Sequence, residues 1–277
     1  MDTFLEIEIP CNEETQETLI ATLDQLEFDS YWQEDGCLKA YVMESRFVAE
    51  ALDALLTQLN ISSSGVKISK LENKNWNEEW EKNFDPVIID TRAVIKAPFH
   101  NLPEKFPLEI LIQPKMSFGT GHHETTRLMV EYLLELDLSG KNVMDAGTGT
   151  GVLAIVAEKR GAALVDAFDI EDWAFENFKE NTILNRGINL KISLGTIREA
   201  DLRKTQYDLI LANIQRNVLL EEMAQYASKL GAGAELLISG FYTQDADVLV
   251  EEASRHGLEE LERRSNNNWV AMKLRKL

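Results

Sequence analysis

A glycine-rich segment in the middle of the chain has the residue types of a ligand-binding turn. Asp145 is followed by Gly147, Gly149 and Gly151, and an apolar run with helical spacing begins directly after them. Glycines permit a tight turn and a close approach of a ligand to the backbone, and a helix start offers N–H groups without intrahelical partners. An anion at position 145 would repel a pyrophosphate but attract an ammonium or sulfonium. The segment therefore favours S-adenosylmethionine over a dinucleotide, and a purely structural glycine turn is the alternative.

A second acidic residue follows at the distance that a nucleoside-binding site requires. Asp169 closes the apolar run 164–169 and comes 18 residues after Gly151. A carboxylate at this place accepts hydrogen bonds from both hydroxyls of a ribose. Ile170, the next residue, is expected to pack on the adenine face. Asp is common at strand ends, so this assignment depends on its spacing from the glycine segment.

Asn213 ends another apolar run, 207–213. In open α/β sheets ligands lie at the carboxyl ends of the strands, so an Asn there directs an amide oxygen toward the transferable methyl group. An amine nucleophile needs such an acceptor to orient its lone pair, and we predict that Asn213 is both a cofactor contact and the catalytic residue. The alternative is that Asn213 is the N-cap of a helix over residues 217–230.

The segment 117–126, Ser-Phe-Gly-Thr-Gly-His-His-Glu-Thr-Thr, carries two glycines and two histidines. We interpret it as a flexible lid over the cofactor, with Phe118, Gly119, His122 and Thr126 as contacts. A metal site is the alternative, but the two histidines are adjacent and no further ligands converge on them in the sequence. We therefore expect no metal.

These residues need a framework of alternating strands and helices. From residue 127 onward, apolar runs of strand length alternate with helical patterns, which favours an α/β, Rossmann-like fold with a mostly parallel sheet. Two closing strands without an intervening helix predict a C-terminal antiparallel hairpin. The expected strands are 142–146, 164–169, 207–213, 234–239, 258–264 and 268–274.

The first 71 residues form a separate pattern of β-α-β-β-α-β order, which predicts a small α+β, ferredoxin-like domain. Its expected strands are 4–9, 30–35, 37–43 and 66–71, and its helices are 12–27 and 46–60. Trp76, Trp80 and Phe84 recur every four residues, which indicates a linker helix over 72–85. Short β-like segments then lead into a catalytic domain spanning 86–277.

The charge distribution limits the possible partners. The 277 residues contain 28 basic and 47 acidic side chains, a net charge of −19, and residues 1–70 carry 14 acidic but 4 basic ones. This acidity serves solubility or attracts a basic partner, and it makes direct nucleic-acid binding unfavourable. No apolar run is long enough to cross a bilayer and the N-terminus lacks a secretory pattern, so we expect a cytoplasmic protein without membrane contact.

Together these motifs resemble the PrmA family, the bacterial ribosomal protein L-eleven methyltransferases. The resemblance rests on Phe-Gly-Thr-Gly-His at 118–122, the loop 145–151, Asp169-Ile170 and Ala-Asn-Ile at 212–214, and it covers essentially the whole chain. It implies a class I methyltransferase with a seven-stranded sheet behind a substrate-recognition domain that swings on the linker helix.

The same resemblance implies S-adenosyl-L-methionine as cofactor and ribosomal protein L-eleven as substrate, methylated at its α-amine and lysine side chains. The family's cofactor contacts correspond to Thr126, Gly147, Asp169 and Asn213. We expect a monomer acting on the free ribosomal protein before ribosome assembly. The segment 170–174, Ile-Glu-Asp-Trp-Ala, departs from the Asp-Pro that usually follows the ribose acid.

Other classes of function remain to be distinguished. Nucleic-acid adenine and release-factor glutamine methyltransferases carry Asn-Pro-Pro-Tyr or a similar sequence after the fourth strand, whereas Ile214, Gln215 and Arg216 follow here. A nicotinamide oxidoreductase is disfavoured by the Gly-x-Gly-x-Gly spacing. A methyltransferase for another protein or a small-molecule amine, and a non-catalytic cofactor-binding assembly factor, are the remaining alternatives.

Overall fold

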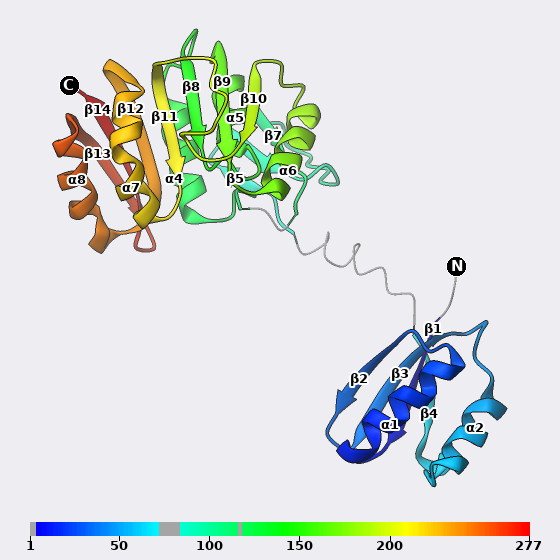
Figure 1. Ribbon diagram of the computed structural model, residues 1–277. Coiled ribbons are helices and arrows are strands. Elements are labelled where there is room, and N and C mark those ends of the chain that lie inside the picture. The colour runs from blue at the N-terminus through cyan, green and yellow to red at the C-terminus, as the bar shows by residue number, and fades with distance from the viewer. Residues whose placement is uncertain (1–3, 72–83, 116–117) are drawn as a thin grey trace. The chain divides into compact units, whose positions relative to one another are not determined.

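In a computed structural model the chain divides into two compact units, Met1–Asn83 and Phe84–Leu277 (Figure 1). The structure describes residues 4–71, 84–115 and 118–277. The expected linker helix, with Trp76 and Trp80, lies outside the described residues except for its last two positions. Each unit is described below by itself.

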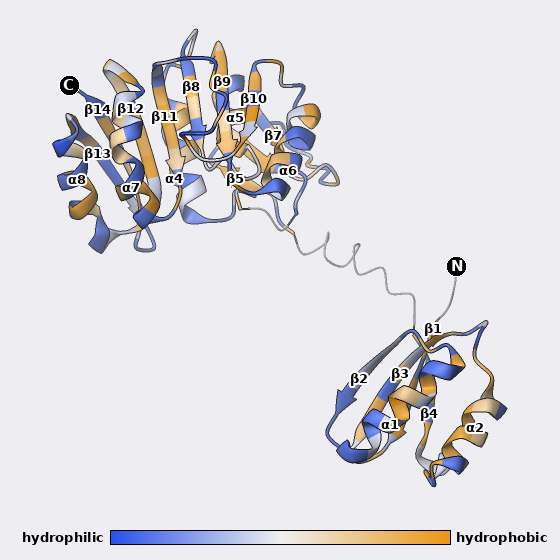
Figure 2. Cartoon of the chain, viewed as in Figure 1, coloured by the Kyte–Doolittle hydropathy of each residue, from blue (hydrophilic) through white to orange (hydrophobic). Residues whose placement is uncertain are grey.

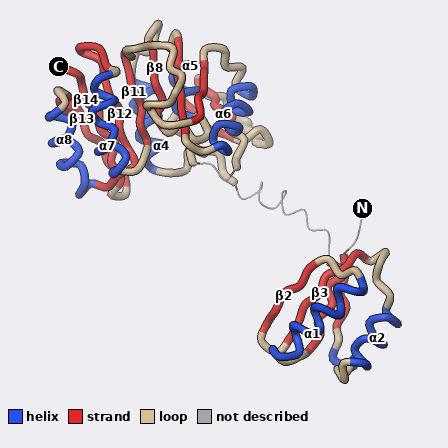
Figure 3. Tube along the Cα trace, viewed as in Figure 1, coloured by secondary structure: helices blue, strands red, loops and turns tan. Residues whose placement is uncertain are grey.

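The N-terminal unit is a four-stranded antiparallel sheet with both helices on one face (Figure 3). The strand order β2-β3-β1-β4 is that of the ferredoxin-like arrangement, which confirms the predicted pattern. Asn12 caps the first helix, because its side chain accepts a hydrogen bond from the Thr15 N–H at 2.9 Å. The elements are β1 (Phe4–Pro10), α1 (Glu13–Leu23), β2 (Ser30–Glu34), β3 (Cys37–Met43), α2 (Ala49–Gln58) and β4 (Lys67–Lys70), with short 3₁₀ turns at Asp24–Leu26 and Ser63–Gly65.

Strict alternation of buried and exposed side chains along its strands explains why the helices cover only one face of this small sheet. Leu5, Ile7 and Ile9 of β1 are buried, whereas the residues between them are partly exposed. Successive side chains of a strand point to opposite faces, so the alternating residues form a single apolar layer. Leucines of α1 and α2, among them Leu19 and Leu56, pack onto that layer and complete the core of the unit.

The second unit is built on a seven-stranded sheet of order β10-β9-β8-β11-β12-β14-β13. The first five strands pair in parallel, and the last two form an antiparallel hairpin, as expected. The strands are β8 (Asn142–Ala146), β9 (Leu164–Asp169), β10 (Leu190–Leu194), β11 (Tyr207–Asn213), β12 (Leu230–Tyr242), β13 (Leu258–Asn266) and β14 (Trp269–Lys276). The helices are α4 (Glu124–Glu135), α5 (Val152–Lys159), α6 (Asp172–Leu184), α7 (Arg216–Ser228) and α8 (Ala246–Arg255), with a 3₁₀ turn at Thr243–Asp245 before α8.

Both faces of this sheet are covered, so its central strands are apolar on both sides (Figure 2). One face packs Val143, Val165 and Leu211 against α4, α5 and Phe178 of α6. The other face packs alternate residues of the same strands, such as Met144, against α7 and α8. None of the described helices combines the length and the apolarity that crossing a bilayer would require.

One strand of the sheet was not predicted. The edge strand β10 has the sequence Leu-Lys-Ile-Ser-Leu, and none of its residues is fully buried. Because an edge strand needs no continuous apolar run, this stretch gives only a weak signal in the sequence. The short β-like segments expected before the catalytic core form a separate sheet, β5 (Val87–Ile89), β6 (Ala93–Lys96) and β7 (Leu108–Leu111).

Asn181 of α6 connects this small sheet with the glycine segment. Its side chain accepts a hydrogen bond from the Gln113 N–H at 2.7 Å and donates one to the Thr150 carbonyl oxygen at 2.8 Å. The residue is fully buried. Truncating it would leave the partly buried Gln113 N–H and the buried Thr150 carbonyl oxygen without this partner.

We therefore expect Asn181→Ala to lower the free energy of unfolding by about 2–4 kcal/mol. Glu176→Ala, at an exposed position of the same helix, serves as the control and should change it by less than about 0.5 kcal/mol. Urea unfolding of both variants measures the difference, and equal stabilities would contradict this role of Asn181.

Candidate functional site

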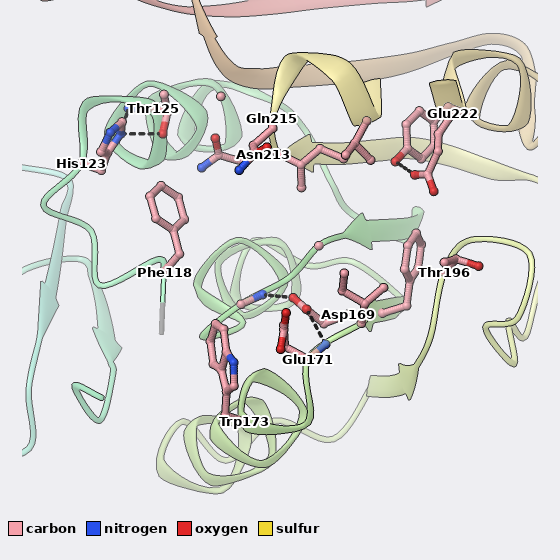
Figure 4. Close-up of a pocket in the computed structure, with 18 of the residues that line it drawn as sticks. Phe118, His123, Thr125, Asp169, Glu171, Trp173, Thr196, Asn213, Gln215 and Glu222 are labelled. Atoms are coloured by element: carbon pink, nitrogen blue, oxygen red, sulfur yellow. Dashed lines mark hydrogen bonds between the residues drawn. The ribbon is translucent and has the colours of Figure 1, made fainter. Parts of the chain in front are cut away.

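A cavity of about 440 Å³ opens at the carboxyl ends of β8, β9 and β11 (Figure 4). This is the edge of a doubly wound sheet at which ligands bind, and its size suits a nucleoside-sized molecule. Its walls come from the glycine segment, the ends of β9 and β11, α7 and the hairpin. The lining residues are Phe118, His123, Thr125, Gly147, Gly149, Phe168, Asp169, Ile170, Glu171, Trp173, Thr196, Asn213, Ile214, Gln215, Val218, Glu222, Tyr226, Gly240 and Trp269.

Asp169 lies at the centre of the cavity wall and is held by two backbone groups. One carboxylate oxygen accepts a hydrogen bond from the Gly149 N–H at 2.9 Å, and the other accepts one from the Glu171 N–H at 3.1 Å. A carboxylate has about four acceptor positions, so two hydrogen bonds leave capacity for a ligand's hydroxyl groups. The assignment of Asp169 as the ribose-binding acid stays a prediction, and this free capacity is compatible with it.

The glycine segment turns beneath the cavity with left-handed backbone conformations. Gly147 has φ 64° and Gly149 has φ 54°, and both line the cavity. A β-carbon on Gly149 would lie 2.5 Å from the Phe118 carbonyl oxygen. Gly151 has φ 83° and packs instead against the Phe178 ring, outside the lining. Glycine is therefore required at these turns by backbone conformation and by close contacts.

The predicted lid segment is attached to the same turn. The Thr150 N–H donates to the Phe118 carbonyl oxygen at 3.0 Å, and the Thr150 hydroxyl donates to the Gly119 carbonyl oxygen at 2.7 Å. Phe118 lines the cavity with half of its surface exposed, whereas Gly119, also expected as a cofactor contact, lies outside the lining and accepts the hydrogen bond from Thr150. His122 lies outside the lining, where its Nε2 atom is 2.8 Å from the Asp85 carbonyl oxygen.

Asn213 ends β11 beside this segment. Its Nδ2 atom donates to the buried Thr126 hydroxyl at 3.4 Å, and its buried Oδ1 atom has no hydrogen-bond partner among the described residues. The N-cap of α7 is Gln215, so the alternative assignment of Asn213 as a helix cap does not hold. Thr126 itself is outside the lining and fixes the orientation of the Asn213 amide.

Asp145 lies beneath the turn and not on the cavity wall. Its side chain is 1% exposed and accepts a hydrogen bond from the Thr148 hydroxyl at 2.5 Å. Burial raises the pKa of this carboxyl from 3.8 to about 7, and the hydrogen bond from Thr148 opposes that shift. The sequence places Asp145 in contact with the cofactor, whereas the structure gives it a supporting position under the glycine segment.

Several lining residues were not anticipated from the sequence. Trp269 of the hairpin and His123 form an aromatic wall with Phe118, with ring centroids 4.6 Å apart for His123 and Trp269 and 5.2 Å for Phe118 and His123. Glu222 and Tyr226 come from α7, far from any motif. Only Glu171 and Trp173 had a local sequence signal for a place in the lining, because they follow the expected ribose acid Asp169 by two and four residues.

The described residues fit S-adenosylmethionine. Asp169 offers acceptors for ribose hydroxyls, and the glycine turn leaves room beside the backbone. Ile170 exposes 66% of its surface, which suits a flat apolar base, and Phe118 and Trp173, 49% and 47% exposed, add apolar surface elsewhere in the cavity. The unpartnered Asn213 Oδ1 atom can accept a hydrogen bond from a bound molecule. Among the described residues no group of three or more His, Cys, Asp or Glu side chains is placed to hold a metal ion.

Comparison with known proteins decides the family. The family described as "Ribosomal protein L11 methyltransferase (PrmA)" matches residues 5–277 of the chain. The chain belongs to this family. The PrmA relatives include the ribosomal protein L11 methyltransferases of Porphyromonas gingivalis, 46% identical over 94% of this chain and 91% of that protein, and of Phocaeicola vulgatus, 42% identical over 95% of each.

A solved structure agrees with the PrmA assignment. The crystal structure of the ribosomal protein L11 methylase from Lactobacillus delbrueckii subsp. bulgaricus superimposes with a TM-score of 0.64 at 25% identity, covering 70% of this chain and all of that one. The chain is thus a Rossmann-like, S-adenosylmethionine-dependent methyltransferase. The fold class and cofactor expected from the sequence are confirmed.

The raised pKa of Asp145 predicts a pH-dependent stability of the cofactor-free protein. The folded-state pKa of about 7 lies above the ordinary value of 3.8, so this group's contribution to stability is present at low pH and is lost as pH rises through 7. Between pH 5.5 and 8 the free energy of unfolding of the wild type should therefore fall by about 2 kcal/mol relative to Asp145→Asn.

Urea unfolding at several pH values measures this difference. Asp172→Asn, at an exposed position in the first turn of α6, is the matched control and should follow the wild type throughout. If Asp145→Asn also runs parallel to the wild type, the carboxyl does not titrate in this range.

Proposed function

We propose that this chain transfers methyl groups from S-adenosylmethionine to the α-amine and lysine ε-amines of ribosomal protein L11. The observation that carries the proposal concerns Asn213, which lines a cavity centred on Asp169 and whose Oδ1 atom has no hydrogen-bond partner among the described residues. Asp169 would hold the ribose, and the methyl donor supplies an electrophilic methyl group when bound. The family's name and its relatives' names support the ribosomal protein as substrate.

Orientation of the amine is the main task of Asn213. Its Nδ2 atom is engaged by Thr126, and its amide oxygen, which has no hydrogen-bond partner among the described residues, would accept an N–H from an entering amine. That hydrogen bond turns the nitrogen lone pair toward the methyl group. Alignment of reacting groups accounts for a large part of such catalysis. Asn213 and backbone carbonyls orient the amine, while water takes the released proton.

The amine must be neutral to react, and the two substrate amines differ in this respect. An α-amine has an ordinary pKa of about 7.7–8.0, whereas a lysine has one of about 10.4. Deprotonating the lysine near neutral pH therefore costs about 3.5 kcal/mol more. Entry into the partly apolar cavity beside a cationic donor lowers the pKa of the lysine ammonium and reduces this cost.

The acidic N-terminal unit supports a role in substrate recognition. Residues 1–70 carry ten of the nineteen excess negative charges, which suits a basic ribosomal protein that is free before ribosomal RNA covers it. We assign substrate recognition to residues 1–71, a linker to 72–85 and catalysis to 86–277. The enzyme would act as a monomer in the cytoplasm, without direct nucleic-acid binding or membrane contact.

The direct test is transfer of labelled methyl groups. Labelled S-adenosylmethionine is mixed with free L11, assembled ribosomes, nucleic acid or a small-molecule amine, and the modified positions are located by mass spectrometry. We expect label on the α-amine and lysines of free L11. Label on another protein or amine alone would support the alternative substrate class. Donor binding without transfer would support a non-catalytic assembly factor.

Asn213→Ala should lower the turnover number for L11 by about 100-fold or more, because the amine loses the acceptor that orients it. The dissociation constant of S-adenosylhomocysteine, measured by calorimetry, should rise by less than about tenfold, because Asp169 keeps the ribose although Asn213 is itself an expected cofactor contact. Asn217→Ala, at an exposed position in α7, is the matched control for both measurements. Unchanged turnover with intact cofactor binding would exclude the catalytic role of Asn213.

A further inference from the structure

One end of the cavity carries two polar residues of α7 that the proposed reaction does not use. Tyr226 is fully buried, and its hydroxyl donates a hydrogen bond to the Glu222 carboxylate one helical turn earlier. Burial is the main factor that raises the pKa of Tyr226, so its hydroxyl stays protonated at neutral pH. Since the only donor of this pair is already engaged, Glu222 presents acceptors alone to the cavity.

Thr196, a third lining residue at this end, also offers only hydrogen-bond acceptors to the cavity. The Thr196 hydroxyl donates to the Glu199 carboxylate at 2.9 Å, and the Thr196 N–H donates to the same oxygen at 3.0 Å. With its hydrogen used in this way, the Thr196 oxygen offers only lone pairs to the cavity. Figure 4 shows Thr196 and Glu222 on one side of Asp169, with Phe118 and His123 on the other.

The order of the chemical groups in the methyl donor indicates which of them lies at this end of the cavity. Its ribose links the adenine to the sulfonium, so a ribose on Asp169 with its methyl group facing Asn213 leaves the base to the remaining part of the cavity. That part is bounded by Ile170, Val218, Thr196 and Glu222. Ile170 and Val218 expose 66% and 39% of their surfaces and offer apolar faces to a ring.

We propose that Glu222, positioned by Tyr226 and assisted by Thr196, recognises the 6-amino group of the donor's adenine. A 6-amino group has two N–H donors, which match acceptors on the carboxylate and the hydroxyl. A 6-oxo group would present lone pairs to those same acceptors and would be repelled. The inference deepens the proposed function and rests on S-adenosylmethionine as the methyl donor.

Calorimetric binding of two products tests this recognition without any catalytic turnover. S-adenosylhomocysteine is compared with S-inosylhomocysteine, which carries a 6-oxo group in place of the amine. We expect the wild type to bind the adenine compound about 10- to 100-fold more tightly, the range for a hydrogen bond to a charged acceptor.

Glu222→Gln should reduce this preference to less than about threefold, because an amide can present either its oxygen or its NH₂ group. Glu221→Gln, at an exposed position one residue earlier, removes the same charge outside the cavity and should keep the full preference. Tyr226→Phe and Thr196→Val should give intermediate values, and thermal unfolding confirms that each variant is folded.

Equal binding of the two compounds by the wild type would overturn the inference, whatever the variants show. An unchanged preference for the adenine compound in Glu222→Gln would overturn it as well. If that variant does not fold, an unchanged preference in both Thr196→Val and Tyr226→Phe would overturn the inference instead. Absence of binding to S-adenosylhomocysteine by the wild type would overturn the methyl donor itself, and with it the proposed function. The two failures are therefore distinguishable.

Discussion

The Asp169 carboxylate accepts hydrogen bonds from two backbone N–H groups that belong to different segments, Gly149 of the glycine turn and Glu171 ahead of α6. A largely buried carboxylate is costly unless such donors satisfy it, and charge-assisted hydrogen bonds are among the stronger ones in proteins. This side chain, together with hydrogen bonds from the Gly147 and Thr148 N–H groups to the Phe168 carbonyl oxygen, fixes the end of β9 against the turn that follows β8. The other walls of the cavity lie around these two segments.

Hydrogen bonds and the short chain segments between them connect Asp169 with Asn213, the residue proposed to orient the substrate amine. The turn that donates to Asp169 also holds Phe118 and Gly119 through Thr150. The segment then enters α4, whose Thr126 holds the amide of Asn213. The groups assigned to the cofactor and the group assigned to the amine thus share one framework, which suits a reaction that depends on alignment.

Much of this framework is predictable from local sequence. β8, β9 and β11 begin and end at the predicted residues, because buried parallel strands are continuous apolar runs. β10 was missed since an edge strand lacks such a run. Glu222 and Trp269 could not be found either, because only the folding of α7 and the hairpin brings them to the cavity. The position of Asp145 under the turn likewise depends on the local backbone path, which spacing does not reveal.

The most direct test of the account is the affinity of Asp169→Ala for S-adenosylhomocysteine, measured by calorimetry. Loss of the carboxylate removes both the ribose acceptors and the connection to Gly149, so we predict at least about 100-fold weaker binding. Asp172→Ala, three residues later and exposed, should bind as the wild type does. Affinity of a folded Asp169→Ala within about threefold of the wild type would contradict the central role of this carboxylate.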